Sequence, residues 1–477
     1  MATFSERFGL LKAQGELDFV DVRLDRDTPL FVDPFALSMR QDRWGADAHA
    51  LLLSYFQEVI DRIRRGRIDG ARHLLSHLSE PNETRLGLSS GRPQGAGIGS
   101  YQADQLLEGL RQSQAVQTGL LSSLEECELM IPGISSDKIS DLATNVLRGQ
   151  LARYTAEQCD LHGVATRPVS VGPCFDGSTH DWVNGYLELP VADGHPVMLV
   201  PKAIVRFAPA YDHRQYYQHF ALEYLQAEHL AAGSALVHTL RGGRRKVYKK
   251  ELARVFPCSK EFLFEFSRQH PEVLAEYKEH LADLERRGVA TEVETADEVG
   301  LAAALRAALG AVQPGSDQAT TYHRLMIGIL EFVFFPLLVG PKKEVEIHDG
   351  RKRIDILMEN AAPSGIFHRL HDVRHLPCSY IPIECKNYTR EIANPELDQI
   401  SSRFSTNRGR AGLICCRAFD DRARFIERCR DTFRDGRGLV LPVDDATVAR
   451  WLRLIEGGRR AELDGEIGQL VDEIWIS

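Results

Sequence analysis

The stretch SYIPIECKNYTREIANPELDQI (residues 379–400) places two opposite charges inside an apolar run. The run itself is typical of a buried strand. Side chains of a strand point alternately to its two faces, so Glu384 and Lys386 share one face while Cys385 points to the other. A carboxylate and an ammonium on one face of a buried strand are costly unless they pair or serve a site. This pair is therefore the starting point for predicting the fold and the function.

The residues around this strand predict an ordered series of helices and strands. Apolar periodicity predicts a helix at 322–338, strands at 342–348, 351–360 and 379–388, a helix from about Pro395, a strand at 411–419, a helix at 420–436 and a strand at 438–445. This order of elements predicts an α/β sandwich built around a mixed sheet.

A second carboxylate lies on the strand before Glu384. Asp355 stands between two isoleucines, where an acid is costly to bury without a partner or a cation. Asp355 and Glu384 could together hold Mg²⁺ (or Mn²⁺) through oxygen, with the backbone carbonyl of Cys385 as a further ligand. Such a metal polarises a phosphate oxygen and activates a water, and Lys386 could stabilise the water or the developing charge.

An acid on one strand followed by Glu-x-Lys on the next resembles the PD-(D/E)XK nuclease superfamily of restriction-endonuclease-like enzymes. The resemblance covers about a quarter to a third of the chain and matches Asp355, Glu384 and Lys386. It implies an α/β/α core with a mixed sheet and metal-dependent hydrolysis of phosphodiester bonds. It also implies a role for Glu331 on the first helix, as a metal ligand, and for Gln399 on the helix after the Lys strand.

Arg403, one helical turn after Gln399, would share the face of that residue. The sequence departs from the family pattern in three places. Ile354 replaces the usual proline, residues 360–377 form a long insertion between the two acidic strands, and Glu346 is a second candidate acid.

The rest of the chain is assigned more coarsely. We expect an N-terminal α+β region at 1–125, opening with strands at 19–24 and 28–33, and a mixed, then helical region at 126–310 that could recognise or regulate. The segment 187–200 is typical of a hairpin turning at Ala192, Asp193 and Gly194. A linker near 310–318 would precede a nuclease-like domain at 319–477.

Composition excludes several classes of protein. Nine cysteines in 477 residues do not make a disulfide framework, and the first residues lack the layout of a signal peptide. No run reaches the roughly 18 apolar residues of a membrane helix. We therefore expect a cytoplasmic protein without a membrane partner. The net charge of −9 leaves room for local basic patches.

Three further patterns carry weaker hypotheses. The basic run from Arg241 to Lys250 could contact phosphates or be an ordinary solvated helix face. The candidate nucleic-acid-binding residues are Arg244, Arg245, Lys246, Lys249 and Lys250 of this run, and Arg403 outside it. The glycine-rich stretch at 83–110 could hold a phosphate or be a flexible loop. Cys159, His162, Cys174 and His180 could form a zinc site, or they could be unrelated core cysteines and surface histidines.

The sequence thus predicts a Mg²⁺-dependent endonuclease acting on DNA, with RNA as an open alternative. A large N-terminal region suggests a restriction or anti-phage defence effector, with a homo-oligomer or an activating protein as partner. The alternative is a module on the same fold that binds nucleic acid or protein without cutting, and a weaker third is a zinc-containing regulator.

Overall fold

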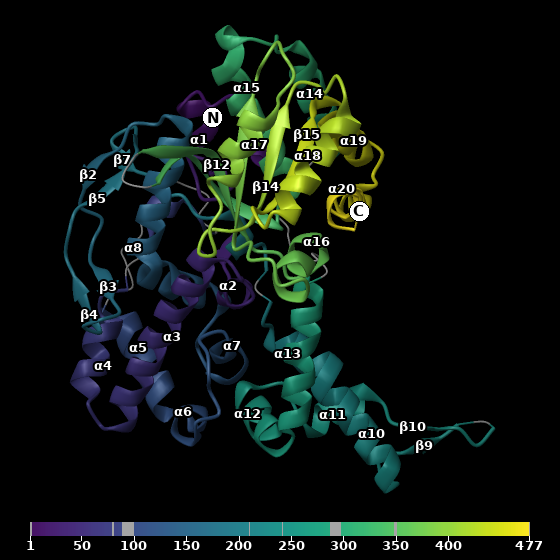
Figure 1. Cartoon of the computed structure of the whole chain (residues 1–477). Coiled ribbons are helices and arrows are strands. Elements are labelled where there is room, and N and C mark those ends of the chain that lie inside the picture. The colour runs from purple at the N-terminus through teal and green to yellow at the C-terminus, as the bar shows by residue number, and fades with distance from the viewer. Residues whose placement is uncertain are drawn as a thin grey trace.

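The buried apolar side chains gather in two large cores. One is built from residues 4–281, and the other mainly from residues 302–474. The computed structural model describes residues 2–78, 81–87, 100–208, 210–240, 242–286, 297–347 and 351–476, and for residues 100–102 the backbone alone. In Figure 1 the first core is drawn in purple to teal, and the second forms the green and yellow part of the molecule.

The second core surrounds a five-stranded mixed sheet, as the sequence predicted. The strands lie in chain order: β11 (Leu338–Ile347), β12 (Lys352–Asn360), β13 (Tyr380–Lys386), β14 (Ala411–Cys416) and β15 (Leu439–Asp444). The pairs β11–β12 and β12–β13 are antiparallel, whereas β13–β14 and β14–β15 are parallel. Each parallel pair is joined by a helical crossover, which parallel strands require.

Helices cover both faces of this sheet. They are α14 (Glu298–Ala311), α15 (Ala319–Phe334), α16 (Gly365–His368), α17 (Asn394–Ser401), α18 (Arg422–Arg434), α19 (Asp445–Glu456) and α20 (Leu463–Trp475). Gln399 of α17 contacts Glu384 on one face of β13, and Tyr322 of α15 lies near Cys385 on the other. The alternation predicted for residues 384–386 is thereby confirmed.

The N-terminal core does not divide at residue 125. Its long helices α3 (Arg43–Arg64) and α8 (Ser136–His162) pack against each other across that boundary. The other helices up to residue 130 are α1 (Phe4–Arg7), α2 (Pro34–Ser38), α4 (Ile68–Leu75), α5 (Ser100–Gln112), α6 (Gln114–Thr118) and α7 (Glu126–Met130). The second boundary is also earlier than expected, because α14 packs against α19 and belongs to the C-terminal core.

The strands of the N-terminal part are short and pair locally. They are β1 (Phe31–Val32) with β8 (Val205–Arg206), β2 (Arg167–Val169) with β5 (Leu187–Leu189), β3 (Cys174–Asp176) with β4 (Asp181–Val183), and β6 (Val191–Ala192) with β7 (His195–Pro196). The predicted turn is confirmed between β6 and β7, where Asp193 and Gly194 have positive φ. The strand expected at 19–24 is wrong: this segment makes only isolated bridges at Phe19 and Arg23.

A helical region follows, consisting of α9 (His213–Tyr216), α10 (Leu222–Ala232), α11 (Lys249–Val255), α12 (Lys260–Gln269) and α13 (Pro271–Arg286). The hairpin of β9 (His238–Thr239) and β10 (Arg245–Lys246) projects from this region, away from the sheet (Figure 1). No helix in the described parts of the chain is long and apolar enough to cross a bilayer.

Buried charges join the two cores. Lys202 of the N-terminal part lies 3.0 Å from Glu331 of α15, and both side chains are buried. The Gly340 N–H of β11 donates to Asp18 at 3.0 Å, and Lys342 of the same strand pairs with Glu157 of α8 at 2.9 Å. The first strand of the sheet, β11, and the helix before it, α15, are thereby held to the N-terminal core.

Candidate functional site

Asp355 stands at the point where two strands part. The ladder between β12 and β13 runs from Glu359–Tyr380 to Ile356–Ile383, so Asp355 and Glu384 come directly after its last pair. The Asp355 Oδ2 accepts a hydrogen bond from the Cys385 N–H at 3.0 Å. The Cys385 N–H lies beyond the last pair of the ladder with β12, and the Asp355 carboxylate accepts its hydrogen bond instead. This bond fixes Asp355 beside β13.

Lys386 connects the two carboxylates. Its Nζ lies 2.9 Å from Glu384 Oε2 and 3.5 Å from Asp355 Oδ2. Glu384 is fully buried and Lys386 nearly so, whereas the Asp355 side chain is 30% exposed. The three residues that the sequence singled out therefore converge within hydrogen-bond or ion-pair reach, with Asp355 as the member that is most open to solvent.

Gln399 and Arg403 hold Glu384 from the other side. The Gln399 Nε2 donates to Glu384 Oε2 at 2.7 Å, and Arg403 Nε lies 3.7 Å from Glu384 Oε1. Pro395, at the start of α17, suits the first turn of a helix because its missing N–H would be unpaired there. Arg403 follows the end of α17, yet it still reaches the same carboxylate. Both residues therefore contact Glu384, Gln399 from α17 and Arg403 from just beyond it.

The pKa values at this site are shifted by burial and by close charges. Burial and, next, the charge of Asp355 raise the pKa of Glu384 to about 7, although Lys386 and Arg403 oppose the shift. Burial alone would lower the pKa of Lys386, but the neighbouring Asp355 and Glu384 outweigh it and raise that pKa. Shifts of this origin in one cluster are typical of functional sites.

An open cavity of about 570 Å³ lies over these residues. Asp355, Cys385 and Lys386 form part of its lining, and Tyr388 and Arg390 contribute from the loop after β13. Arg390 lies over the Tyr388 ring, with 4.9 Å from Cζ to the ring centroid. Asp355 and Lys386 thus face the space that a ligand would occupy, while Glu384 lies behind them.

Two residues of α15 line the same cavity and were missed from the sequence. Thr320 and His323 lie one turn apart on the helix and face the cavity beside Asp355. Burial lowers the pKa of His323 against the opposing charge of Asp355, so its imidazole is neutral at pH 7. No described residue forms a hydrogen bond with His323 Nε2. A lone histidine in a helix gives no sequence signal that would reveal this position.

The structure does not bring Glu331 to the cavity. Glu331 lies eight residues after His323 on α15, about 12 Å further along the helix at 1.5 Å per residue. There it pairs with Lys202, and burial raises its pKa to about 7. The predicted metal-ligand role of Glu331 is corrected accordingly. Glu346, the second candidate acid, is exposed and pairs with Arg353 at 3.2 Å.

The basic run lies elsewhere. Arg244, Arg245 and Lys246 are exposed on the projecting hairpin rather than on a helix, and Lys249 of α11 pairs with Glu223 at 2.8 Å. Lys250 is also exposed on α11, and Arg241 lies outside the described residues. Residues 88–99 of the glycine-rich stretch likewise lie outside them. The basic hairpin remains a separate candidate surface for a polyanion.

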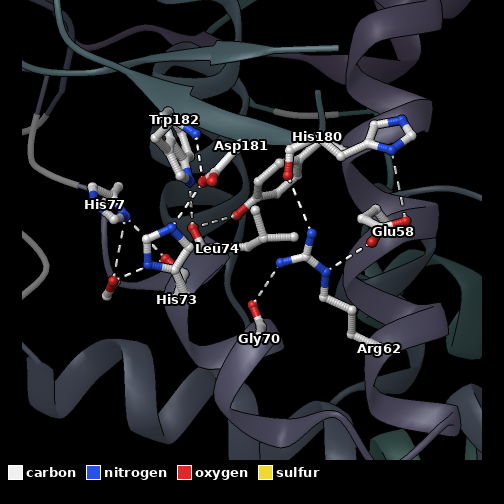
Figure 2. A network of polar contacts seen from close by, with 11 residues as sticks. Glu58, Arg62, Gly70, His73, Leu74, His77, His180, Asp181 and Trp182 are labelled. Atoms are coloured by element: carbon white, nitrogen blue, oxygen red, sulfur yellow. Dashed lines mark hydrogen bonds and ion pairs between the residues drawn. The ribbon is translucent and has the colours of Figure 1, made fainter. Parts of the chain in front are cut away.

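The four residues of the zinc hypothesis lie apart. Cys174 packs against Gly149 of α8, whereas Cys159 lies ten residues further along this helix, about 15 Å away. His162 packs against the Phe19 ring. Figure 2 shows His180 in a different network, 3.9 Å from Glu58, with its carbonyl accepting from Arg62. Within the described ranges, no group of three or more His, Cys, Asp or Glu residues could hold a metal ion.

Two carboxylates and an open cavity still fit a hard cation of the Mg²⁺ type. Mg²⁺ commonly takes only one or two protein carboxylates and keeps several waters or substrate phosphates. Glu384 Oε1 is buried, and none of the described residues donates a hydrogen bond to it. Lys386 already places a positive charge between Asp355 and Glu384. The donor set therefore suits Mg²⁺ or Mn²⁺ with an incomplete protein shell, and does not suit a closed zinc site.

Comparison with known proteins covers only the N-terminal part. Residues 9–212 match a domain of unknown function, DUF8370. That range spans most of the N-terminal core, including α3 and α8, and ends before the helical region. No curated protein and no solved structure matches the chain. The chain is therefore similar to this uncharacterised domain at its N-terminus, and the C-terminal site rests on its own geometry.

Proposed function

We propose that this protein is a metal-dependent phosphodiesterase that cuts DNA as an endonuclease, with a restriction-endonuclease-like C-terminal core. One observation carries the proposal: Lys386 lies within 3.5 Å of both Asp355 and Glu384 beside an open cavity. The order of elements from α15 to β15 and the mixed sheet agree with the resemblance seen in the sequence.

Asp355 and Glu384 would hold Mg²⁺, with the Cys385 carbonyl as a third oxygen. Bound there, the ion would polarise a phosphate oxygen and make a water molecule more acidic. Asp355 is the open ligand and Glu384 the buried one, so entry of the ion is expected from the cavity. The raised pKa of Glu384 means that a proton competes for this position around neutral pH.

Lys386 would move from the carboxylates toward the substrate. Without a metal, its ammonium neutralises both acids; a divalent ion would take over that task and repel the ammonium. The freed Nζ has the cavity as its open side, where it would stabilise the charge that develops on the phosphate. A methionine of similar length at this position keeps the packing but removes the charge.

Gln399 and Arg403 are positioning residues. Both contact Glu384 rather than the cavity, and they fix the direction of its carboxylate from behind. A charge-assisted hydrogen bond of this kind is worth about 1.5–3 kcal/mol. Their loss should reduce turnover by misplacing Glu384, with substrate binding less affected.

Tyr388 and Arg390 suit the substrate side of the cavity. The Tyr388 side chain is exposed, and a base could stack on it while Arg390 contacts a phosphate. The basic hairpin of β9 and β10 would add a second, remote contact with the phosphate backbone. Both surfaces would accept RNA as well as DNA, so the choice between them is left to experiment. The N-terminal region would then recognise or regulate, as an effector of restriction or phage defence requires.

One feature favours a module that binds without cutting. Lys386 and Arg403 already balance the charges of Asp355 and Glu384, so the cluster is stable without a metal ion. In such a protein the cavity would bind nucleic acid, and substitution of Lys386 would change affinity only.

The test is cleavage of supercoiled plasmid, linear duplex, single-stranded DNA and RNA by the full chain with Mg²⁺ or Mn²⁺. We expect Lys386→Met and Asp355→Asn to lose at least about 100-fold in rate. Lys352→Met is the matched control, because Lys352 begins the same strand as Asp355 and lies outside the cavity. Cleavage that survives both site substitutions refutes the proposal. Tight binding without cleavage of any substrate would favour the non-cutting module.

A further inference from the structure

A second cavity, of about 200 Å³, lies at the junction of the two cores. Trp44 of α3 and Gln158 of α8 form its N-terminal wall, and Glu359 and Tyr380 of the sheet form the opposite one. Glu359 and Tyr380 are paired across β12 and β13, four residues from Asp355 and Glu384 on those strands. The cavity is therefore built by both parts of the chain, at the other end of the strands that carry the candidate site.

The walls of this junction cavity carry a buried acceptor without a hydrogen-bond partner. Gln158 is 1% exposed, and its Oε1 accepts no hydrogen bond from any described residue. Asp42, 2% exposed, also lines the cavity and pairs with Arg40 at 2.7 Å. Buried acceptors of this kind are costly unless something donates to them. An occupant with N–H groups would meet this need.

The charge of the lining is negative even after its internal ion pairs are formed. Its three cations each pair with a carboxylate of the same lining: Arg40 with Asp42, Arg43 with Asp47 and Lys342 with Glu157. Two acids, Asp18 and Glu359, remain in excess by charge; Asp18 accepts from the Tyr154 hydroxyl, and Glu359 lies 4.0 Å from the already paired Lys342. Burial and, next, the charge of Asp42 raise the pKa of Glu359 to about 7, as expected for a carboxyl group in a negative, enclosed setting.

Aromatic rings complete the lining. The rings of Trp44 and Tyr154 lie with centroids 5.8 Å apart at 53°, and Tyr380 lies on the opposite wall. Ring faces attract cations, and the attraction is strongest for tryptophan in a desolvated site. The Trp44 Nε1 is buried and has no acceptor among the described residues. A ligand that also carries an acceptor would satisfy this N–H.

We propose that the junction cavity binds a small organic cation, with a primary ammonium or guanidinium group that donates to Gln158 and Glu359 and lies against the Trp44 ring. The cavity is smaller than the roughly 300 Å³ at which drug-sized sites begin, so the occupant is a small amine or a single side chain. A free amine and the arginine side chain of a partner protein share this chemistry. The inference does not depend on phosphodiesterase activity.

The test is isothermal titration calorimetry of the full chain with putrescine, agmatine and L-arginine, beside a capped Gly-Arg-Gly peptide. We expect saturable binding of at least one probe and none of succinate. Binding of the peptide but not of agmatine would assign the cavity to a protein side chain, and the reverse to a free amine; either supports the proposal.

Trp44→Leu and Glu359→Gln should each weaken binding about tenfold, in line with the loss of one cation–π or charged contact. Trp182→Leu is the matched control, because Trp182 lies on β4 in a separate polar network (Figure 2) and does not line the cavity. Thermal midpoints of all variants show that they fold. The proposal is overturned if no probe binds, if both cavity variants leave binding unchanged, or if Trp182→Leu weakens binding as much as they do.

Discussion

Replacing Lys202 by methionine should destabilise the protein by an amount that depends strongly on pH. Lys202 Nζ lies 3.0 Å from Glu331 Oε1 and 4.0 Å from the centroid of the Phe335 ring. Burial raises the pKa of Glu331 from 4.5 to about 7, with Lys202 opposing the shift and Asp18 adding to it. Because this carboxyl pKa is higher in the folded than in the unfolded state, wild-type stability decreases as the pH rises from about 4.5 to 7. The ion pair is fully formed only above about pH 7.

The magnitude follows from this linkage. With methionine at position 202 the pKa of Glu331 rises further, and the carboxyl group remains protonated. The variant therefore loses the free energy that ionisation gives the wild type, about 1.4 kcal/mol for each pH unit above 7. The pH-dependent cost is near zero at pH 6, about 1.4 kcal/mol at pH 8 and about 2.7 kcal/mol at pH 9. Loss of the contact with Phe335 adds up to about 2 kcal/mol at every pH.

The assay is the free energy of unfolding from urea titrations at pH 6, 7, 8 and 9. Glu331→Gln supplies the control background, because it removes the titrating group while keeping the shape. Lys202→Met should cost the same at every pH in that background. Asp18 and Lys12, which also act on Glu331, are present in all variants and cancel. An equal cost of Lys202→Met at pH 6 and pH 9 in the otherwise wild-type chain would refute the reasoning.

Substitutions at three other positions test which residues belong to the site. Glu331→Gln should leave phosphodiesterase activity within about threefold of wild type, since Glu331 lies two turns from the cavity; a loss as large as that of Asp355→Asn would return Glu331 to the site. Gln399→Leu should lower kcat about 10- to 100-fold with little change in KM, because it removes a hydrogen bond of about 1.5–3 kcal/mol to the buried Glu384; steady-state kinetics that show an unchanged kcat would contradict this positioning role. Tyr388→Ala should weaken binding of a single-stranded oligonucleotide by about 1–3 kcal/mol in fluorescence anisotropy, while Tyr388→Phe keeps the affinity. An equal loss in both variants would exclude stacking on the ring.

The C-terminal sheet was predictable because each of its strands and helices has a clear local pattern of apolar residues. The apolar run within 379–388 and the unbroken apolar runs at 411–416 and 438–443 mark strands. The association of Asp355, Glu384 and Lys386 was predictable for the same reason, since adjacent strands bring such positions together. The finer likeness to restriction endonucleases remains a prediction.

The errors come from contacts that no local pattern encodes. Glu331 was expected at the site because it lies on the first helix, but it pairs instead with Lys202, 129 positions earlier in the sequence. His323 is a single residue in an amphipathic helix, and only the neighbouring strand shows that it faces a cavity. The segment 19–24 alternates like a strand, yet its neighbours offer it only single bridges at Phe19 and Arg23.

The packing of α14 on α19 affects how the C-terminal half can be studied in isolation. Ala302, Leu305 and Leu309 of α14 are buried in that core, so a fragment starting at residue 319 would lack one helix and expose the apolar side chains that α14 covers. Such a fragment is expected to aggregate whatever its catalytic competence. A fragment starting at residue 297 keeps the helix with its Asp297 N-cap, and an activity comparison between the two lengths would report on folding rather than on chemistry.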